Sequence, residues 1–220
     1  MKKFLMFLCA MMLVFGMGGS ANALDFDFSG TFTQDNDITL LNFTVGTDST
    51  ITIFSSSWGN DVGSDGYVAG AGFDPILAIW NNTGGIVSEQ DDGHNVGSTL
   101  SNGVSYSHGY WDSYYDVSLT AGDYTASIAQ YDNFVAGSNL SDGFKYDGNP
   151  TFTQSFSSVS QTYFNGCWLD NDYRTGDWDF HILNVADASH PVPEPSTILL
   201  IGVGLLGLVG YSRKHFSKKS

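Results

Sequence analysis

The fold class follows from one stretch, YYDVSLTAGDYTASIAQY at residues 114–131. Apolar and polar residues alternate on both sides of a Thr-Ala-Gly-Asp turn at 120–123, and a period of two residues is typical of strands with one buried face. The apolar positions are Tyr115, Val117, Leu119, Tyr124, Ala126 and Ile128. A tight turn between two such segments predicts a β-hairpin over residues 114–131.

Shorter alternating segments recur on both sides of this stretch. They predict strands at residues 26–32, 38–45, 50–54, 86–87 and 178–185. Residues 73–80 form the most apolar run of the domain, and their aromatic and β-branched side chains predict a central strand.

Polar segments rich in glycine and aspartate separate these strands. We expect loops at 58–72, 91–111 and 132–150, and one or two weaker strands within 151–168. No segment of the domain shows a sustained helical period. The pattern predicts an all-β protein, a two-sheet antiparallel β-sandwich that is jelly-roll-like, with an N-terminal signal helix and a single C-terminal transmembrane helix outside it.

The N-terminus has the parts of a secretory signal peptide. Two lysines precede an apolar run at residues 4–15, and Ala21 and Ala23 fit a small-residue cleavage site before Leu24. We expect residues 1–23 to be removed and residues 24–190 to form one domain with its own core. Cys167 would be the one cysteine left, which excludes an internal disulfide and favours a buried thiol.

The C-terminus, residues 191–220, has three parts in a fixed order. Pro193, Glu194 and Pro195 form a short motif that the prolines keep extended. Residues 197–211 are uncharged and predict a transmembrane helix, although such a helix would be only roughly 22 Å long. The basic residues of the tail at 212–220 would stay in the cytoplasm. A short anchor behind an accessible motif fits transient retention and later removal; the alternative is a plain membrane anchor that carries prolines.

This tail resembles the PEP-CTERM sorting signal of Gram-negative bacteria. The resemblance implies recognition by an exosortase, a membrane transpeptidase that acts at or near residues 193–195. It also implies an inner-membrane intermediate, delivery to the cell surface or extracellular matrix, and a link to exopolysaccharide and biofilm.

The domain is similar to the FDP-motif family of PEP-CTERM proteins, which in turn resembles the bacterial pre-peptidase C-terminal β-sandwich. The motifs that carry this similarity are GFDPILAIW at 72–80, EQDD at 89–92, LTAGDYT at 119–125 and QYDN at 130–133. The similarity implies a β-sandwich and transfers no catalytic activity.

The charge of the chain is unevenly distributed. All 23 acidic residues lie between Asp25 and Glu194, but only Lys145 and Arg174 of the eight basic residues do, so the exported part has a net charge of −21. Such a surface repels nucleic acid and anionic polymers and attracts divalent cations.

The sequence contains no motif of a known catalytic site. A GxSxG elbow, an HExxH pair, a P-loop and a dinucleotide fingerprint are all absent. A Ser-His-Asp triad, a thiol site at Cys167 and a zinc site at His94 and His108 remain open alternatives, but none has ligand or nucleophile spacing in its favour. We therefore expect a protein that is not an enzyme.

Calcium is the favoured cofactor, because it takes oxygen ligands from carboxylates and loop carbonyls. Three loci offer such ligands: Asp35 with Asp37, Asp91 with Asp92, and Asp170 with Asp172. The other interpretation of these residues is that they cap turns at strand ends. We interpret Asp74, which precedes Pro75, as such a structural cap.

Aromatic residues beside polar loops raise a further hypothesis. Trp58 and Trp111 are candidates for stacking on sugar rings, or else they cover the end of the sandwich core. Together these observations favour an exported, non-enzymatic surface or matrix protein. The alternative is a carbohydrate- or Ca²⁺-binding adhesion module, and a hydrolase is the third hypothesis.

Overall fold

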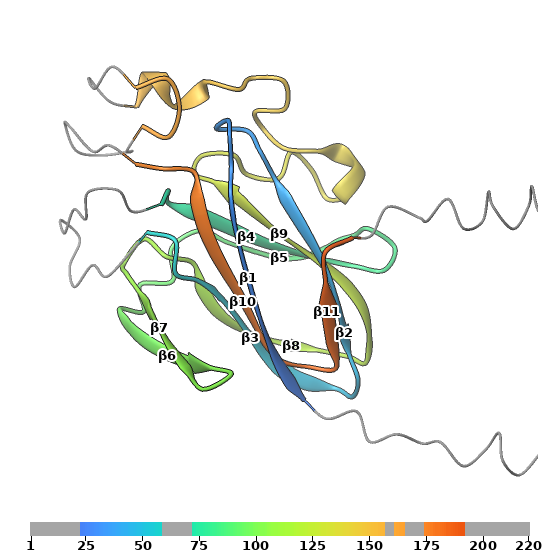
Figure 1. Ribbon diagram of the computed structural model, residues 1–220. Coiled ribbons are helices and arrows are strands. Elements are labelled where there is room, and N and C mark those ends of the chain that lie inside the picture. The colour runs from blue at the N-terminus through green and yellow to red at the C-terminus, as the bar shows by residue number, and fades with distance from the viewer. Residues whose placement is uncertain (1–22, 59–71, 157–160, 166–173, 192–220) are drawn as a thin grey trace, which may run out of the picture. The chain divides into compact units, whose positions relative to one another are not determined.

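The computed structural model describes residues 23–58, 72–156, 161–165 and 174–191 (Figure 1). The chain divides into two compact units, Met1–Ala188 and Ser189–Ser220, and the second is described only at residues 189–191. The predicted signal peptide, Cys167 and the predicted transmembrane helix at 197–211 lie outside the described residues. None of the helices within those ranges is long and apolar enough to cross a membrane.

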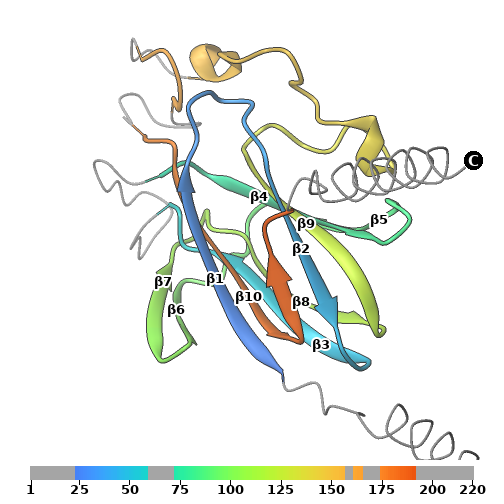
Figure 2. The same cartoon turned by 45° about the vertical axis from the view of Figure 1, so that its right-hand side comes forward.

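Two large sheets form the body of the β-sandwich, and the strand pairs with a defined register are antiparallel (Figures 1 and 2). The prediction of a two-sheet β-sandwich is confirmed. The first sheet has the order β1 (Leu24–Thr31), β10 (Asp177–Val185), β3 (Ser49–Ser55), β8 (Tyr114–Leu119). The second has the order β11 (Asp187–Ser189), β2 (Thr39–Val45), β9 (Gly122–Gln130), β4 (Pro75–Asn81), β5 (Ile86–Gln90).

The core lies between the two sheets. Alternate residues of each strand point into it, as the period of two requires. The fully buried members are Leu41, Ile51, Ile53, Leu77, Ile79, Ala126, Ile128, Phe180 and Ile182. Phe32 stacks on Phe73 with 5.2 Å between ring centroids and extends the core toward one end of the sandwich.

The predicted hairpin at 114–131 is wrong, although both of its strands exist. β8 pairs with β3, with Val117 opposite Ile51, whereas β9 pairs with β2 and β4 in the other sheet. Alternation reports only that one face of a strand is buried. Two strands that face each other across a core therefore have the same pattern as two strands side by side.

A second connection between the two sheets lies beside the one that joins β8 to β9. β2 and β3 are joined across the core beside the β8–β9 connection, and Val45 lies opposite Gly122 while Ser49 lies opposite Leu119. Asp48 accepts a hydrogen bond from the Ala121 amide at 2.8 Å, which holds the two connections together. The four strands are thus one long pair folded over at a common corner, which is jelly-roll-like as expected.

β4 is buried on both faces, which explains the continuous apolar run at 73–80. Leu77 and Ile79 face the core, while Trp80 on the opposite face contacts Phe144 of the segment after β9. That segment, residues 131–156, holds two short 3₁₀ helices, η1 (Leu140–Asp142) and η2 (Phe152–Ser155). The weak strands predicted within 151–168 are wrong for the described residues, which form η2, bends and one isolated bridge.

The predicted loop at 91–111 contains an extra two-stranded sheet, β6 (Gly97–Ser101) with β7 (Val104–His108). It contacts the outer face of the first sheet. Asn102 at its tip donates to Asp27 at 2.8 Å, and the Tyr106 ring lies 4.0 Å from the His181 ring. Both strands are short, rich in serine and largely exposed, so they lack the alternation that reveals a strand.

Candidate metal centre

Three aspartates converge at one end of the β4–β5 strand pair in the second sheet. Asp74, Asp91 and Asp92 each place a carboxylate oxygen within 4.8 Å of the others. Asp74 directly precedes β4, and the other two directly follow β5. Because β4 and β5 pair antiparallel, with Leu77 opposite Gln90, the beginning of one strand meets the end of the other.

Burial makes this cluster electrostatically costly. Asp74 is only 5% exposed, and one oxygen of each of the three carboxylates is buried without a hydrogen-bond partner within the described part of the chain. Burial and the charges of Asp91 and Asp92 raise the pKa of Asp74 well above its usual value, against a smaller opposing effect of Arg174. Burial, together with the charges of Asp92, Asp132 and Glu89, raises the pKa of Asp91 to about 7.

The structure therefore brings two of the predicted calcium residues, Asp91 and Asp92, into one cluster, and it adds Asp74. The interpretation of Asp74 as a turn cap missed this role. The signal was present in the sequence, because the FDP motif stands at the start of β4 and the DD motif follows the end of β5, and these two strands pair as neighbours. The pairing of β4 with β5 had to be known before this signal could be recognised.

Asp35 and Asp37 accept hydrogen bonds that hold the fold, and a calcium site at these two residues stays a prediction. Asp35 is fully buried, and its carboxylate accepts hydrogen bonds from the Thr153 amide and hydroxyl and from the Phe164 amide at 2.6–2.9 Å. Asp37 caps its own turn by accepting from the amides of Thr33 and Gln34. Both oxygens of Asp35 thus accept hydrogen bonds, whereas the donors to Asp37 all lie on its Oδ2. Asp170 and Asp172 lie outside the described residues.

The prediction of Trp58 as an exposed platform for sugar rings also needs correction, because its side chain is buried. It is 7% exposed, and the Arg174 guanidinium lies 3.2 Å from the centre of its ring. The Arg174 side chain also donates to the Trp58 carbonyl. Trp111 is half-buried and packs at an angle against Trp58, with 6.3 Å between ring centroids. A stacking role for Trp111 stays a prediction.

A hydrogen-bonded serine, histidine and aspartate appear where sequence reasoning had not placed them. Ser56 Oγ lies 3.0 Å from His181 Nε2, and His181 Nδ1 lies 2.7 Å from Asp27 Oδ1. The order matches a catalytic triad. However, His181 is 1% exposed, and its ring is sandwiched between Phe54 at 4.4 Å and Tyr106 at 4.0 Å.

The amides beside Ser56 are all engaged elsewhere. The Ser56 amide donates to the Asp179 carbonyl, and those of Ser57 and Trp58 donate to the buried carboxylate of Asp112. An acyl-transfer site needs free donors near its nucleophile to stabilise an oxyanion. The geometry instead favours a structural network that fastens the β6–β7 sheet to β1 and β10.

This network predicts a pH dependence of stability. Burial lowers the pKa of His181 below its usual value of about 6.5, against the opposing effect of Asp27. The unfolded chain therefore takes up the proton first, and stability is lost as the pH falls below about 6.5. Urea unfolding at pH 7.5 and 5.5 should show a smaller loss for His181→Gln than for the wild type. An equal loss in both proteins would contradict this assignment.

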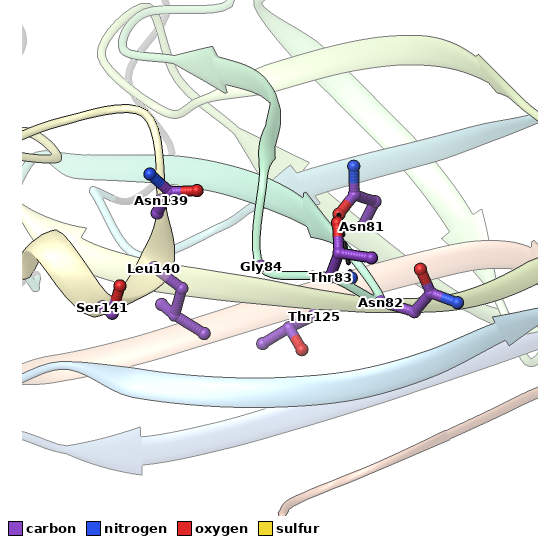
Figure 3. Close-up of a pocket in the computed structure, with 8 residues that line it drawn as sticks. All are labelled: Asn81, Asn82, Thr83, Gly84, Thr125, Asn139, Leu140 and Ser141. Atoms are coloured by element: carbon purple, nitrogen blue, oxygen red, sulfur yellow. Dashed lines mark hydrogen bonds between the residues drawn. The ribbon is translucent and has the colours of Figure 1, made fainter.

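An open pocket of about 530 Å³ lies between the β4–β5 turn, β9 and η1 (Figure 3). Its lining is made of asparagine, threonine, serine, glycine and one leucine, Leu140. The Asn81 side-chain oxygen accepts from Thr83 and from the Gly85 amide, so it serves the turn itself. The lining residues include no titratable group, and the pocket therefore offers hydrogen bonds but no acid or base.

The tail was compared with known protein families. Residues 191–214 match the model of the PEP-CTERM protein-sorting motif. The chain carries a PEP-CTERM sorting signal. The PEP-CTERM match includes Pro193, Glu194 and Pro195, the apolar run and the start of the basic tail. This signal implies processing by an exosortase and is consistent with an exported protein sorted to the cell envelope or surface.

The PEP-CTERM match covers residues 191–214 and therefore does not include the β-sandwich. The similarity of the domain to the pre-peptidase C-terminal family therefore stays a prediction. A comparison of the whole chain with curated proteins found no match.

Proposed function

We propose that this chain is a non-enzymatic structural protein of the cell surface or extracellular matrix, where it contributes to an exopolysaccharide-containing biofilm. The observation that carries the proposal is the PEP-CTERM signal at residues 191–214, which follows a β-sandwich in the sequence. In this proposal the tail holds the chain in the inner membrane until an exosortase acts at residues 193–195. The sandwich is then the part that functions outside the cell.

The polar networks of the sandwich support a structural role. The one Ser-His-Asp arrangement among the described residues has a covered histidine, and the amides next to Ser56 are engaged in other hydrogen bonds. The lining of the described pocket contributes only amide, hydroxyl and aliphatic groups. These features serve packing and fit a module that fills or joins a matrix.

The charge supports an association with the matrix that depends on cations. The exported part carries 23 acidic residues and two basic ones, so it repels an anionic polysaccharide directly. Divalent cations screen this repulsion and bridge carboxylates of both polymers. Chelation of such cations is expected to release the protein from an anionic matrix.

Intact mass measured separately in each cell compartment tests the sorting. In the native host, we expect a matrix species that begins at Leu24 and ends near Pro193. A Glu194→Ala variant should accumulate in the inner membrane with its tail attached. Asp187→Ala, which removes an exposed carboxylate outside residues 191–214, should be processed normally. A wild-type matrix species that still ends at Ser220 would contradict processing.

Gene deletion tests the role in the matrix. Loss of the chain should reduce matrix or floc cohesion, and the wild-type gene, but not the Glu194→Ala form, should restore it. An unchanged surface phenotype after clean deletion would count against the structural role and leave the sorting result standing.

A further inference from the structure

The carboxylates at the start of β4 and the end of β5 have the spacing of ligands on a single ion. Ca²⁺ binds oxygens at about 2.3–2.6 Å, so two oxygens on the same ion lie at most roughly 5 Å apart. The oxygens of Asp74, Asp91 and Asp92 all fall within 4.8 Å of one another. Three carboxylates on two different segments thus meet the distance condition for one cation.

Unsatisfied buried oxygens provide the second observation. Asp74 is at least nine-tenths buried and has a carboxylate oxygen without a hydrogen-bond partner among the described residues, as Asp91 and Asp92 also have. Gln130 is 2% exposed, and its Oε1 likewise lacks a described partner. Gln130 lies opposite Pro75 in the β4–β9 pair, and Pro75 is the residue that follows Asp74. Gln130 therefore belongs to the same end of the sheet as the cluster. Buried polar atoms are normally satisfied, so these buried oxygens point to a partner that the described residues do not supply.

The backbone around the cluster is fixed rather than loose. The buried Ser113 hydroxyl lies 2.6 Å from the Pro75 carbonyl and 3.0 Å from the Gln90 carbonyl, the neighbours of Asp74 and Asp91 in sequence. The hydroxyl has one proton to donate, so the main tie between the two segments is the pairing of β4 with β5, in which Leu77 lies opposite Gln90. This tie is independent of any ion. Such preorganisation lowers the cost of gathering several carboxylates around one cation.

Further acidic residues surround the cluster. Glu89, which accepts from the Val135 amide, and Asp132, which is paired with Lys145, both act on the charge of Asp91. Arg174 is the cation that acts on Asp74, and its influence is smaller than those of the neighbouring carboxylates. The local field therefore attracts cations strongly.

We propose that Asp74, Asp91 and Asp92 bind one Ca²⁺ ion at this end of the sheet. The ligands are all oxygens, which selects a hard cation over zinc. Mg²⁺ demands near-ideal octahedral geometry at about 2.0–2.1 Å, whereas Ca²⁺ accepts the irregular set of oxygens that the segment before β4 and the segment after β5 provide. The ion crosslinks the segment before β4 to the segment after β5 and removes the repulsion between their carboxylates.

Thermal unfolding of the full chain in detergent tests the proposal. Relative to protein in chelator alone, about 5 mM CaCl₂ in excess of the chelator should raise the Tm of the wild type by roughly 4–8 °C. The same excess of MgCl₂ should produce less than about a third of that shift. Calorimetric titration of the wild type should give one Ca²⁺ per chain. These measurements do not depend on sorting, so their failure leaves the function of the tail untouched.

Variants locate the ion. Asp91→Asn/Asp92→Asn should lose the calcium shift, and its Tm in chelator should not fall below that of the wild type, because the substitution relieves like-charge repulsion. Asp91→Asn alone should weaken binding by about tenfold or more. The exposed Asp187→Asn, which removes the same charge elsewhere, should keep the full shift.

Three outcomes would overturn the proposal. The first is a wild type that shows neither a Tm shift nor binding heat with Ca²⁺. The second is a calcium shift that survives in Asp91→Asn/Asp92→Asn. The third, an equal shift with Mg²⁺, would overturn the assignment to calcium.

Discussion

Replacement of Phe180 by alanine is expected to lower the free energy of unfolding by about 3–5 kcal/mol. Phe180 is fully buried in β10, and β10 lies between β1 and β3 in the first sheet. Its ring faces the second sheet as part of the main core. The loss combines the transfer free energy of the aromatic ring with the cavity that rigid strands on either side leave unfilled.

Urea unfolding of the full chain in detergent measures this loss. Leu100→Ala is the matched control, because it also truncates an apolar side chain but at a site that is 65% exposed. It should change the free energy of unfolding by no more than about 0.5 kcal/mol. Similar effects of the two substitutions would mean that the core does not lie between the two sheets as described.

The second large effect is expected at Asp35. Asp35→Ala removes an acceptor from the amides of Thr153 and Phe164 and from the Thr153 hydroxyl, and all of these lie in buried surroundings. Each buried donor left without a partner costs about 1–3 kcal/mol, so a total loss of about 3–5 kcal/mol is expected. The substitution should also release residues 152–156 and 161–165 from the turn that follows β1.

Two matched variants separate this network from a general effect of charge. Asp35→Asn keeps one acceptor oxygen and should cost less than Asp35→Ala. Asp37→Ala, on the same turn but only half-buried, removes an acceptor from the amides of Thr33 and Gln34 and should cost about 1 kcal/mol. Equal losses for Asp35→Ala and Asp37→Ala, measured by urea unfolding, would show that burial of Asp35 is not the reason. None of these losses should depend on calcium.

The strands that could be predicted are those with one face on the core. β1, β2, β3 and β10 alternate clearly, and β4 is recognisable as a continuous apolar run because Phe144 and its neighbours cover the second face. β6 and β7 escaped prediction because they contact the sandwich through single side chains such as Tyr106. A small contact leaves no periodic pattern.

The acidic residues show a similar division. Aspartates in turns are evident in the sequence, but the composition of a turn does not reveal whether its carboxylate meets amides or other carboxylates. Asp35 meets amides, because η2 and the Phe164 segment return to the turn after β1. Asp74 meets Asp91 and Asp92, because β4 and β5 are neighbours.

The sequence by itself determined the PEP-CTERM signal, the all-β class and the positions of the core-facing strands. A sorting motif is read as an extended segment and strand periodicity is a local property, so neither requires distant contacts. Only the tertiary structure decided that residues 114–131 cross between sheets, that Ser56, His181 and Asp27 form a covered network, and that Asp74 joins Asp91 and Asp92. Each of these depends on which strands become neighbours, and that choice is made by burial of the whole core rather than by any one segment.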